Sequence, residues 1–220
     1  KKVLLNREVL VTAGPTYENI DPVRFIGNHS SGKMGFAIAR EFAESGATVH
    51  LVTGPVNLET GHPGVQLTRV TSAAEMYRAC ERVIDRVEIA VFNAAVSDFT
   101  PKSPYDRKVK RGSENWTMEL EPTVDIAGRL GGSKKTGQFF VGFALETDNE
   151  EGNARKKLNK KNLDLVVLNS LREDGAGFGT DTNRITLFWG SEDQEKWELK
   201  PKTQVADELV QWIIKRNGYA

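Results

Sequence analysis

The chain has little cysteine, no excess of charge and no long apolar run. Cys80 is the one cysteine in 220 residues. That excludes an internal disulfide framework and fits a reducing compartment, so we expect a cytoplasmic protein. Thirty basic and thirty acidic side chains cancel, so no global field attracts nucleic acid or an acidic membrane surface. The longest apolar runs have the length of a strand, and no segment is expected to span a bilayer.

Metal-ligand spacing is also missing from the sequence. His29, His50 and His62 are scattered, which gives no support for a structural zinc. Cys80 lies with apolar neighbours at helical spacing, so we expect it to be a thiol in the core. The chain begins with lysine and has no signal-peptide pattern, which suggests a fragment of a longer protein.

Short apolar segments alternate with amphipathic ones in the rhythm of an α/β fold. The pattern predicts strands at 9–12, 47–53, 65–70, 88–94, 139–144 and 163–168, and helices at 31–45, 73–87, 124–130, 153–160 and 205–214. This predicts a Rossmann-like parallel sheet flanked by helices, built as a single domain from residues 1–220.

Two segments depart from that rhythm. Residues 97–121 are polar and contain proline and lysine, so we expect them to project as an arm or flap. Residues 183–189 and 197–199 are predicted to form a C-terminal antiparallel hairpin that turns at 190–195.

The ends of the predicted strands are small, polar and rich in glycine. They read Ala13–Thr16, Thr53–Pro55, Asn93–Asp98, Gly142–Thr147 and Asn169–Ser170. Open α/β sheets bind ligands beyond the carboxyl ends of their strands. Core packing does not require this chemistry, so we expect an active or cofactor site along this edge.

The loop after the first strand leads into a helix start, where free backbone N–H groups and the positive dipole end attract anions. Gly27–Met34 matches GxxxxGK but lacks the Ser or Thr that would hold magnesium, and about a dozen residues separate it from the strand, so a standard P-loop is not predicted. The physics of helix ends alone predicts a phosphate site at Ser30, Ser31, Gly32 and Lys33.

Several polar residues could carry chemistry. Lys157 and Lys161 lie one helical turn apart and repel each other unless an anion lies between them; solvated surface is the alternative interpretation. Asp98 could bind a base, a sugar or a metal, or only cap a turn. Asn28 could donate a hydrogen bond without carrying charge, or be an ordinary loop asparagine.

Six motifs in order closely resemble phosphopantothenoylcysteine synthetase over nearly the whole chain. They are AGPTYENIDPVRFIGNHSSGKMGFAIA, NAAVSDF, KVK, GFALET, KKLNKKNLD and FGTDTN. The resemblance implies a ligase that joins 4′-phosphopantothenate to L-cysteine through an acyl-cytidylate, with CTP as co-substrate, Mg2+ as cofactor, and pyrophosphate and CMP as products. It also implies a homodimer, often fused behind a flavin-dependent phosphopantothenoylcysteine decarboxylase, which would explain the missing methionine.

The same resemblance assigns roles by motif. Asn28 looks like the residue that handles the acyl-cytidylate, Lys108 resembles the catalytic lysine of the K-x-K segment, and Arg24 matches the arginine ahead of Asn28. For the nucleotide it points to Phe92, Asn93, Ala94, Asp98, Lys108, Val124, Asp125, Ile126, Ala127, Phe143, Lys157 and Lys161. The chain departs from the family at Asn93, a position that varies, and at Val124, where proline is common. The residues that hold the metal are not assigned.

Forming an amide from a carboxylate requires a leaving group, and nucleotidyl transfer creates one. Cations must neutralise the carboxylate and the triphosphate as they meet. Arg24, Lys108 and Lys157 are therefore expected to converge at one edge of the sheet, within one chain or with help from a neighbouring subunit.

Two other classes of function remain open. A Rossmann oxidoreductase would have a GxGxxG motif after the first strand, and this chain lacks it. It would also have an acidic residue at the end of the second strand, where this chain has Val52-Thr53-Gly54. A nucleotide- or phosphate-sensing module could use the same edge without turnover. The choice of CTP over ATP depends on the resemblance alone.

Overall fold

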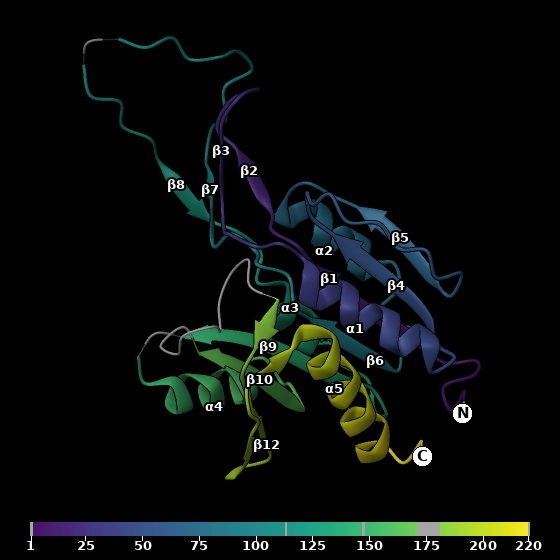
Figure 1. The fold of residues 1–220 in the computed structure, drawn as a ribbon. Coiled ribbons are helices and arrows are strands. Elements are labelled where there is room, and N and C mark those ends of the chain that lie inside the picture. The colour runs from purple at the N-terminus through teal and green to yellow at the C-terminus, as the bar shows by residue number, and fades with distance from the viewer. Residues whose placement is uncertain (1, 113, 147, 171–180, 220) are drawn as a thin grey trace.

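The computed structural model describes residues 2–112, 114–146, 148–170 and 181–219. An eight-stranded sheet forms its centre, in the order β13-β12-β10-β9-β6-β1-β4-β5 (Figure 1). The strands are β1 Glu8–Ala13, β4 Thr48–Thr53, β5 Val65–Arg69, β6 Ile89–Phe92, β9 Phe139–Glu146, β10 Leu165–Ser170, β12 Ile185–Trp189 and β13 Asp193–Lys196. The strands from β10 to β5 run parallel, which confirms the predicted sheet.

The predicted C-terminal hairpin exists but has a different turn and a different place. β12 pairs antiparallel with β10 and β13, so the hairpin forms one edge of the main sheet. Asp193 pairs with Trp189, which places Asp193–Lys196 in a strand where a turn was predicted. Trp197 was expected to begin the second strand, but it follows β13 and is buried in the core.

Five helices within the described residues cover the two faces of the sheet. They are α1 Lys33–Glu44, α2 Ala73–Glu81, α3 Ile126–Gly131, α4 Glu150–Lys160 and α5 Lys202–Arg216. α1 and α5 pack on one face, while α2, α3 and α4 pack on the other. None of the helices in this described part combines the length and apolar character needed to cross a bilayer.

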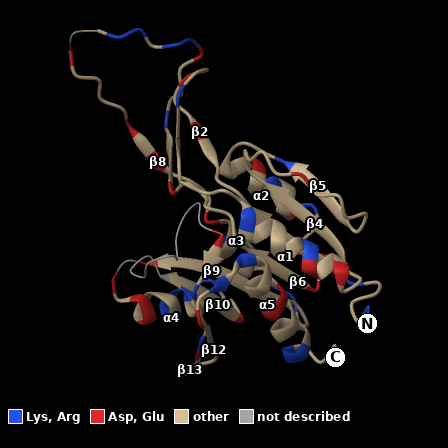
Figure 2. Cartoon of the chain, in the orientation of Figure 1, with Lys and Arg blue, Asp and Glu red and all other residues tan. Residues whose placement is uncertain are grey.

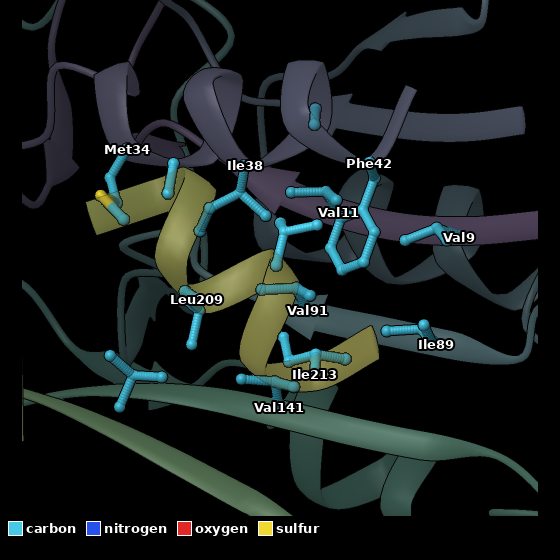
Figure 3. Packing of buried hydrophobic residues seen from close by; sticks show 14 of the residues in the cluster. Val9, Val11, Met34, Ile38, Phe42, Ile89, Val91, Val141, Leu209 and Ile213 are labelled. Carbon is cyan, nitrogen blue, oxygen red and sulfur yellow. The ribbon is translucent and has the colours of Figure 1, made fainter. Parts of the chain in front are cut away.

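The two cores follow from the alternation of side chains along each strand. In β1, Val9 and Val11 face α1 and α5, whereas Leu10 faces the other core. Figure 3 shows Ile38 and Phe42 of α1 beside this valine face. Cys80 is fully buried in the core beneath α2, as predicted.

All five helices differ from the prediction at one or both ends, and two of these differences have a clear local cause. α1 begins at Lys33 because Gly32 has a φ of 75°, a left-handed conformation outside the helix. α2 begins with a capping box between Ser72 and Glu75 and ends at Glu81, six residues before the predicted Val87. The chain beyond Glu81 is rich in β-branched residues, which have lower helix propensity, and it continues in turns.

Two hairpins project from the body of the molecule (Figure 1). They are β2 Tyr17–Asn19 with β3 Phe25–Gly27, and β7 Phe99–Pro101 with β8 Leu120–Pro122. We call residues 17–27 and 99–122 together the projecting arm. The second hairpin coincides with the predicted arm at 97–121 except for its last residue, Pro122, whereas the first was not predicted, because its strands are only three residues long.

Candidate functional site

A first cavity lies between the carboxyl ends of the central strands and α4; we call it the α4 cavity. It is lined by Thr12, Phe92, Ala94, Val96, Asp98, Thr123, Val124, Asp125, Ile126, Ala127, Gly142, Phe143, Lys157 and Lys161. Every residue that the resemblance assigned to the nucleotide is among them, except Asn93 and Lys108. Segments far apart in the sequence therefore meet at the edge where the strand ends predicted a site.

Lys157 and Lys161 enter this cavity because of the helical repeat of α4. Ala154 and Leu158 are buried against the sheet, and the two lysines lie on the same stripe at spacings of three and four. Lys157 Nζ donates to the Phe143 carbonyl at 2.6 Å. Burial, and then the charge of Lys161, lower the pKa of Lys157. An anion in the cavity would relieve this repulsion and favour the charged form of Lys157.

Asp125 is held by two partners that fix it in place. It caps α3 by accepting from Gly128 N at 3.0 Å, and it accepts from Lys161 Nζ at 2.7 Å. Burial alone would raise the pKa of Asp125, but these hydrogen bonds and the nearby lysine charges lower it overall. Asp125 therefore remains a carboxylate that positions Lys161 and the start of α3.

A second cavity, the α1 cavity, adjoins the first on the side of α1. Its volume is about 630 Å³, within the roughly 300–1,000 Å³ of small-molecule sites. It shares Ala94, Val96, Asp98, Phe143 and Lys157 with the α4 cavity. Asn93, which is absent from the first lining, is part of this one. A ligand could therefore extend from one cavity into the other.

Asn28 and the predicted phosphate residues lie along the α1 cavity. Asn28 Nδ2 donates to the Val96 carbonyl at 2.9 Å, so its amide faces the wall that the two cavities share. Ser30, Ser31, Gly32 and Lys33 all line the cavity, but only Lys33 is in the helix, which corrects the predicted helix start. Ser30 Oγ accepts from Gly32 N at 3.3 Å and holds the turn that leads into α1.

α1 approaches β1 closely because residue 35 is glycine. A Cβ at Gly35 would lie 2.6 Å from Ala13 Cβ and 3.0 Å from Asn93 Oδ1. The small residue thus brings the start of α1 against the strand ends, and the first N–H groups of a helix lack acceptors within it. The local sequence therefore provides donors at the floor of the α1 cavity.

Sequence reasoning missed Lys202 and Asn183, which also line the α1 cavity, whereas Asn169 lines it at a strand end where a site was expected. Lys202 is the first residue of α5. Burial and the charge of Lys33 lower the pKa of Lys202, while Asp181 acts in the opposite direction. The starts of α1 and α5 thus bring Lys33 and Lys202 to the same side of the α1 cavity. Asn183 stands in the FGTDTN motif, but the motif alone gave it no role.

Arg24 and Lys108 lie elsewhere, on the projecting arm. Arg24 Nη2 donates to Asp21 Oδ2 and to the Val109 carbonyl, both at 2.6 Å, and its guanidinium lies 5.2 Å from the centre of the Trp116 ring. Lys108, next to Val109, is exposed. Figure 2 shows basic residues along the far part of this arm. Neither residue lines either cavity, so the expected convergence with Lys157 does not occur within one chain.

Asp21 explains why the arm holds Arg24 in place. Its side chain is buried, which by itself would raise its pKa, but hydrogen bonds from Val23 N, Val109 N and Arg24 lower the pKa to about 2. The carboxylate therefore stays charged and joins the turn of one hairpin to the loop of the other.

Carboxylates are sparse around the two cavities. Among the described residues, no three His, Cys, Asp or Glu side chains come together as a metal-binding group. Asp98 is exposed and belongs to the linings of both cavities.

Known proteins are similar to this chain over nearly its whole length. The coenzyme A biosynthesis bifunctional protein CoaBC of Bacillus subtilis (strain 168) is 46% identical over 210 residues, covering 96% of this chain and 52% of that protein. A cysteine/cysteine sulfinic acid decarboxylase from an unknown prokaryotic organism is 50% identical over 214 residues, covering 97% of this chain and 60% of that protein. The chain therefore spans little more than half the length of these relatives.

A solved structure matches both the fold and the extent of the chain. The crystal structure of the C-terminal domain of CoaBC is 37% identical, with a TM-score of 0.83 and coverage of 98% of both chains. The family model described as the DNA/pantothenate metabolism flavoprotein C-terminal domain matches residues 4–216. The chain therefore belongs to the family of DNA/pantothenate metabolism flavoprotein C-terminal domains.

Proposed function

We propose that this chain is a ligase that joins 4′-phosphopantothenate to L-cysteine through an acyl-cytidylate in coenzyme A biosynthesis, releasing pyrophosphate and CMP. One observation carries the proposal. Two adjoining cavities gather every residue that the resemblance assigned to the nucleotide except Lys108, together with Asn28, which it assigned to the acyl intermediate. The names of the CoaBC relatives support the assignment to coenzyme A biosynthesis.

The α4 cavity suits the nucleotide. Lys157 and Lys161 would face the phosphates, because burial and the charge of Lys161 lower the pKa of Lys157 and a bound anion would offset both effects. Mg2+ commonly binds through one or two carboxylates plus substrate phosphates. Asp98, accessible from both cavities, would be such a carboxylate, so the donors present fit an ion that arrives with CTP.

The α1 cavity suits 4′-phosphopantothenate. Its phosphate would lie at the start of α1, where Lys33 and Lys202 approach from two helix starts. Its carboxylate would then extend toward the wall shared by the two cavities, where Asn28 and Asp98 lie. This orientation brings the carboxylate to the α-phosphate of CTP, which the first step requires.

Asn28 is placed to act in the second step. When the cysteine amine attacks the acyl carbonyl, negative charge develops on the oxygen, and a neutral donor aimed at it lowers the barrier. The Asn28 amide has two N–H groups, and the one bond to Val96 fixes its orientation. It can therefore donate its second hydrogen to that oxygen.

A homodimer would supply the missing cations. The arm carries large exposed apolar side chains, including Val23 at 60% exposure and Phe99 at 50%. Exposed apolar patches of this kind mark association surfaces. The arm of a second copy, laid over the α1 cavity, would bring Arg24 and Lys108 to the reacting phosphates.

A nucleotide screen tests the function. The chain is incubated with phosphopantothenate, cysteine and each nucleoside triphosphate, and pyrophosphate and nucleoside monophosphate are read together. Release of both with CTP, dependent on phosphopantothenate, is expected. A sensing module would bind without turnover, and a Rossmann oxidoreductase would bind NADH in isothermal titration in preference to CTP.

Two variants separate the half-reactions. We expect Lys108→Ala to abolish pyrophosphate release, because the cytidylyl transfer needs its charge. We expect Asn28→Ala to lower the rate of amide formation by on the order of 100-fold. Pyrophosphate release should be lowered less. Equal losses in both half-reactions would remove Asn28 from the second step.

A further inference from the structure

Asn183 presents a buried acceptor that nothing in the described structure satisfies. It lies in β11, Thr182–Asn183, with 3% of its surface exposed, and it lines the α1 cavity. No described residue donates a hydrogen bond to its Oδ1. Burying an acceptor without a donor is costly, so a buried amide oxygen at a cavity wall indicates a donor on the ligand.

The position of Asn183 limits which part of the ligand can reach it. β11 pairs with β14, Lys200–Pro201, in the register Asn183 to Lys200 and Thr182 to Pro201. Lys202 follows directly, and its N–H donates to the Asp181 carbonyl at 2.8 Å. Asn183 therefore lies next to the corner formed by Lys33 and Lys202, where the proposed function places the phosphate.

The chemistry of the substrate provides one donor at that distance from the phosphate. In 4′-phosphopantothenate the phosphate ester is followed by a quaternary carbon with two methyl groups and then by a carbon that bears a secondary hydroxyl. The amide N–H comes later, and the carboxylate is at the far end. The hydroxyl is thus the first hydrogen-bond donor beyond the phosphate.

The charges around the cavity favour this donor over the cysteine ammonium. The carboxylates of Asp98 and Glu146 line the cavity and would attract a cation to themselves. Asn183 lies instead beside Lys33 and Lys202, and the carboxylate that acts on both of them, Asp181, is already paired with Lys33 at 2.6 Å. The corner therefore keeps an excess of positive charge, which disfavours a further cation but not a neutral O–H.

We propose that Asn183 accepts a hydrogen bond from the secondary hydroxyl of 4′-phosphopantothenate and so selects the hydroxylated acid. The inference depends on the proposed ligase function. A site built to bond a substrate hydroxyl discriminates strongly against an analogue that lacks it, because the buried acceptor is then left without a partner.

A cycle of substrate and protein changes tests the proposal. The kcat/KM for phosphopantothenate is compared with that for its deoxy analogue, which lacks the hydroxyl, and for its ester analogue, which lacks the amide N–H. Each is measured with the unmodified chain, with Asn183→Ala, and with Asn183→Val, which keeps more of the volume. Asn159→Ala, an exposed change on α4, is the matched control.

The effect of changing Asn183 should depend on whether the substrate carries the hydroxyl. The unmodified chain should prefer the hydroxylated substrate over the deoxy analogue by about 10- to 100-fold in kcat/KM, and both Asn183 variants should lose most of that preference. The Asn159 control should keep it, and the KM for cysteine should not change. Thermal unfolding of the ligand-free variants is measured in parallel, and the preference between the two substrates is compared within each variant, so that a change in stability is separated from the loss of the hydroxyl contact.

Other results would overturn the inference. Equal losses on both substrates, coupling to the ester analogue alone, or a change confined to the cysteine KM would each assign Asn183 to another contact or to none. If the unmodified chain ligates phosphopantothenate but shows no such coupling, only this inference fails. If it ligates no substrate at all, the proposed function fails as well.

Discussion

Two inactive variants of this chain should restore activity when mixed. Lys108 lies on the projecting arm and Asn28 in the α1 cavity, and within one chain the arm residue lines neither cavity. If the arm of one copy completes the cavity of the other, each active site combines the Asn28 of one chain with the Lys108 of its partner. Lys108→Ala and Asn28→Ala therefore damage different halves of each site.

The size of the recovery follows from counting sites. Separately, Lys108→Ala should abolish ligation and Asn28→Ala should lower it by on the order of 100-fold, because each variant lacks a group that stabilises developing charge. In a mixed dimer, one site contains both changes and the other contains neither. Random exchange makes about half of the dimers mixed, so about one quarter of the unmodified activity should return.

The assay is formation of the ligated product after equal amounts of the two variants are mixed under conditions that allow exchange of subunits. A matched control combines Lys108→Ala with Arg24→Ala, two changes on the same arm. Every site in that mixture has a damaged arm, so no recovery is expected. If Lys108→Ala and Asn28→Ala also show no recovery although mixed dimers form, the arm serves its own chain and the two-copy site is wrong.

Three further results are expected. Lys157→Met should weaken CTP binding in isothermal titration by about 10- to 100-fold, because it removes a partly desolvated cation, whereas the exposed Lys156→Met should not. The pKa of Asp21 is lowered from 3.8 to about 2, so its charge stabilises the folded arm above pH 3.8 and that contribution is lost as the pH falls toward 2. The protection of arm amides against hydrogen exchange, relative to their intrinsic rates, should therefore fall in that interval. Asp21→Asn should lower the same protection at neutral pH. Burial raises the pKa of Cys80 to about 12, so a thiol reagent at pH about 8 should label Cys80 only after unfolding, and rapid labelling of the folded protein would contradict its core position.

Features set by local periodicity were predictable from the sequence. The apolar run around Leu10 indicated a strand, and the structure buries both of its faces. The helical spacing of Ala154 and Leu158 indicated a helix, and that helix carries Lys157. The location of the two cavities was also predictable, because the carboxyl ends of parallel strands must share one edge of the sheet. Resemblance, rather than periodicity, selected the individual nucleotide residues that line the α4 cavity.

Features that depend on distant pairing were not predictable. Nothing local to Lys202 indicates that the last helix begins beside the first, since that follows from the packing of α5 against α1. The hairpin of β2 and β3 was missed because its short strands are stabilised by contacts outside themselves. One such contact is the bond from Tyr105 N to the Ile20 carbonyl, which links segments 85 residues apart in the sequence.

The division of cations between arm and cavity has a physical reason. Lys157 already lies close to Lys161, and burial together with the charge of Lys161 lowers the pKa of Lys157. Adding Arg24 and Lys108 to the same cavity would increase the repulsion between cations unless an anion offset it. On the arm, Arg24 has Asp21 as its partner at 2.6 Å. A site assembled from two copies would thus gather its full positive charge only where a triphosphate can neutralise it.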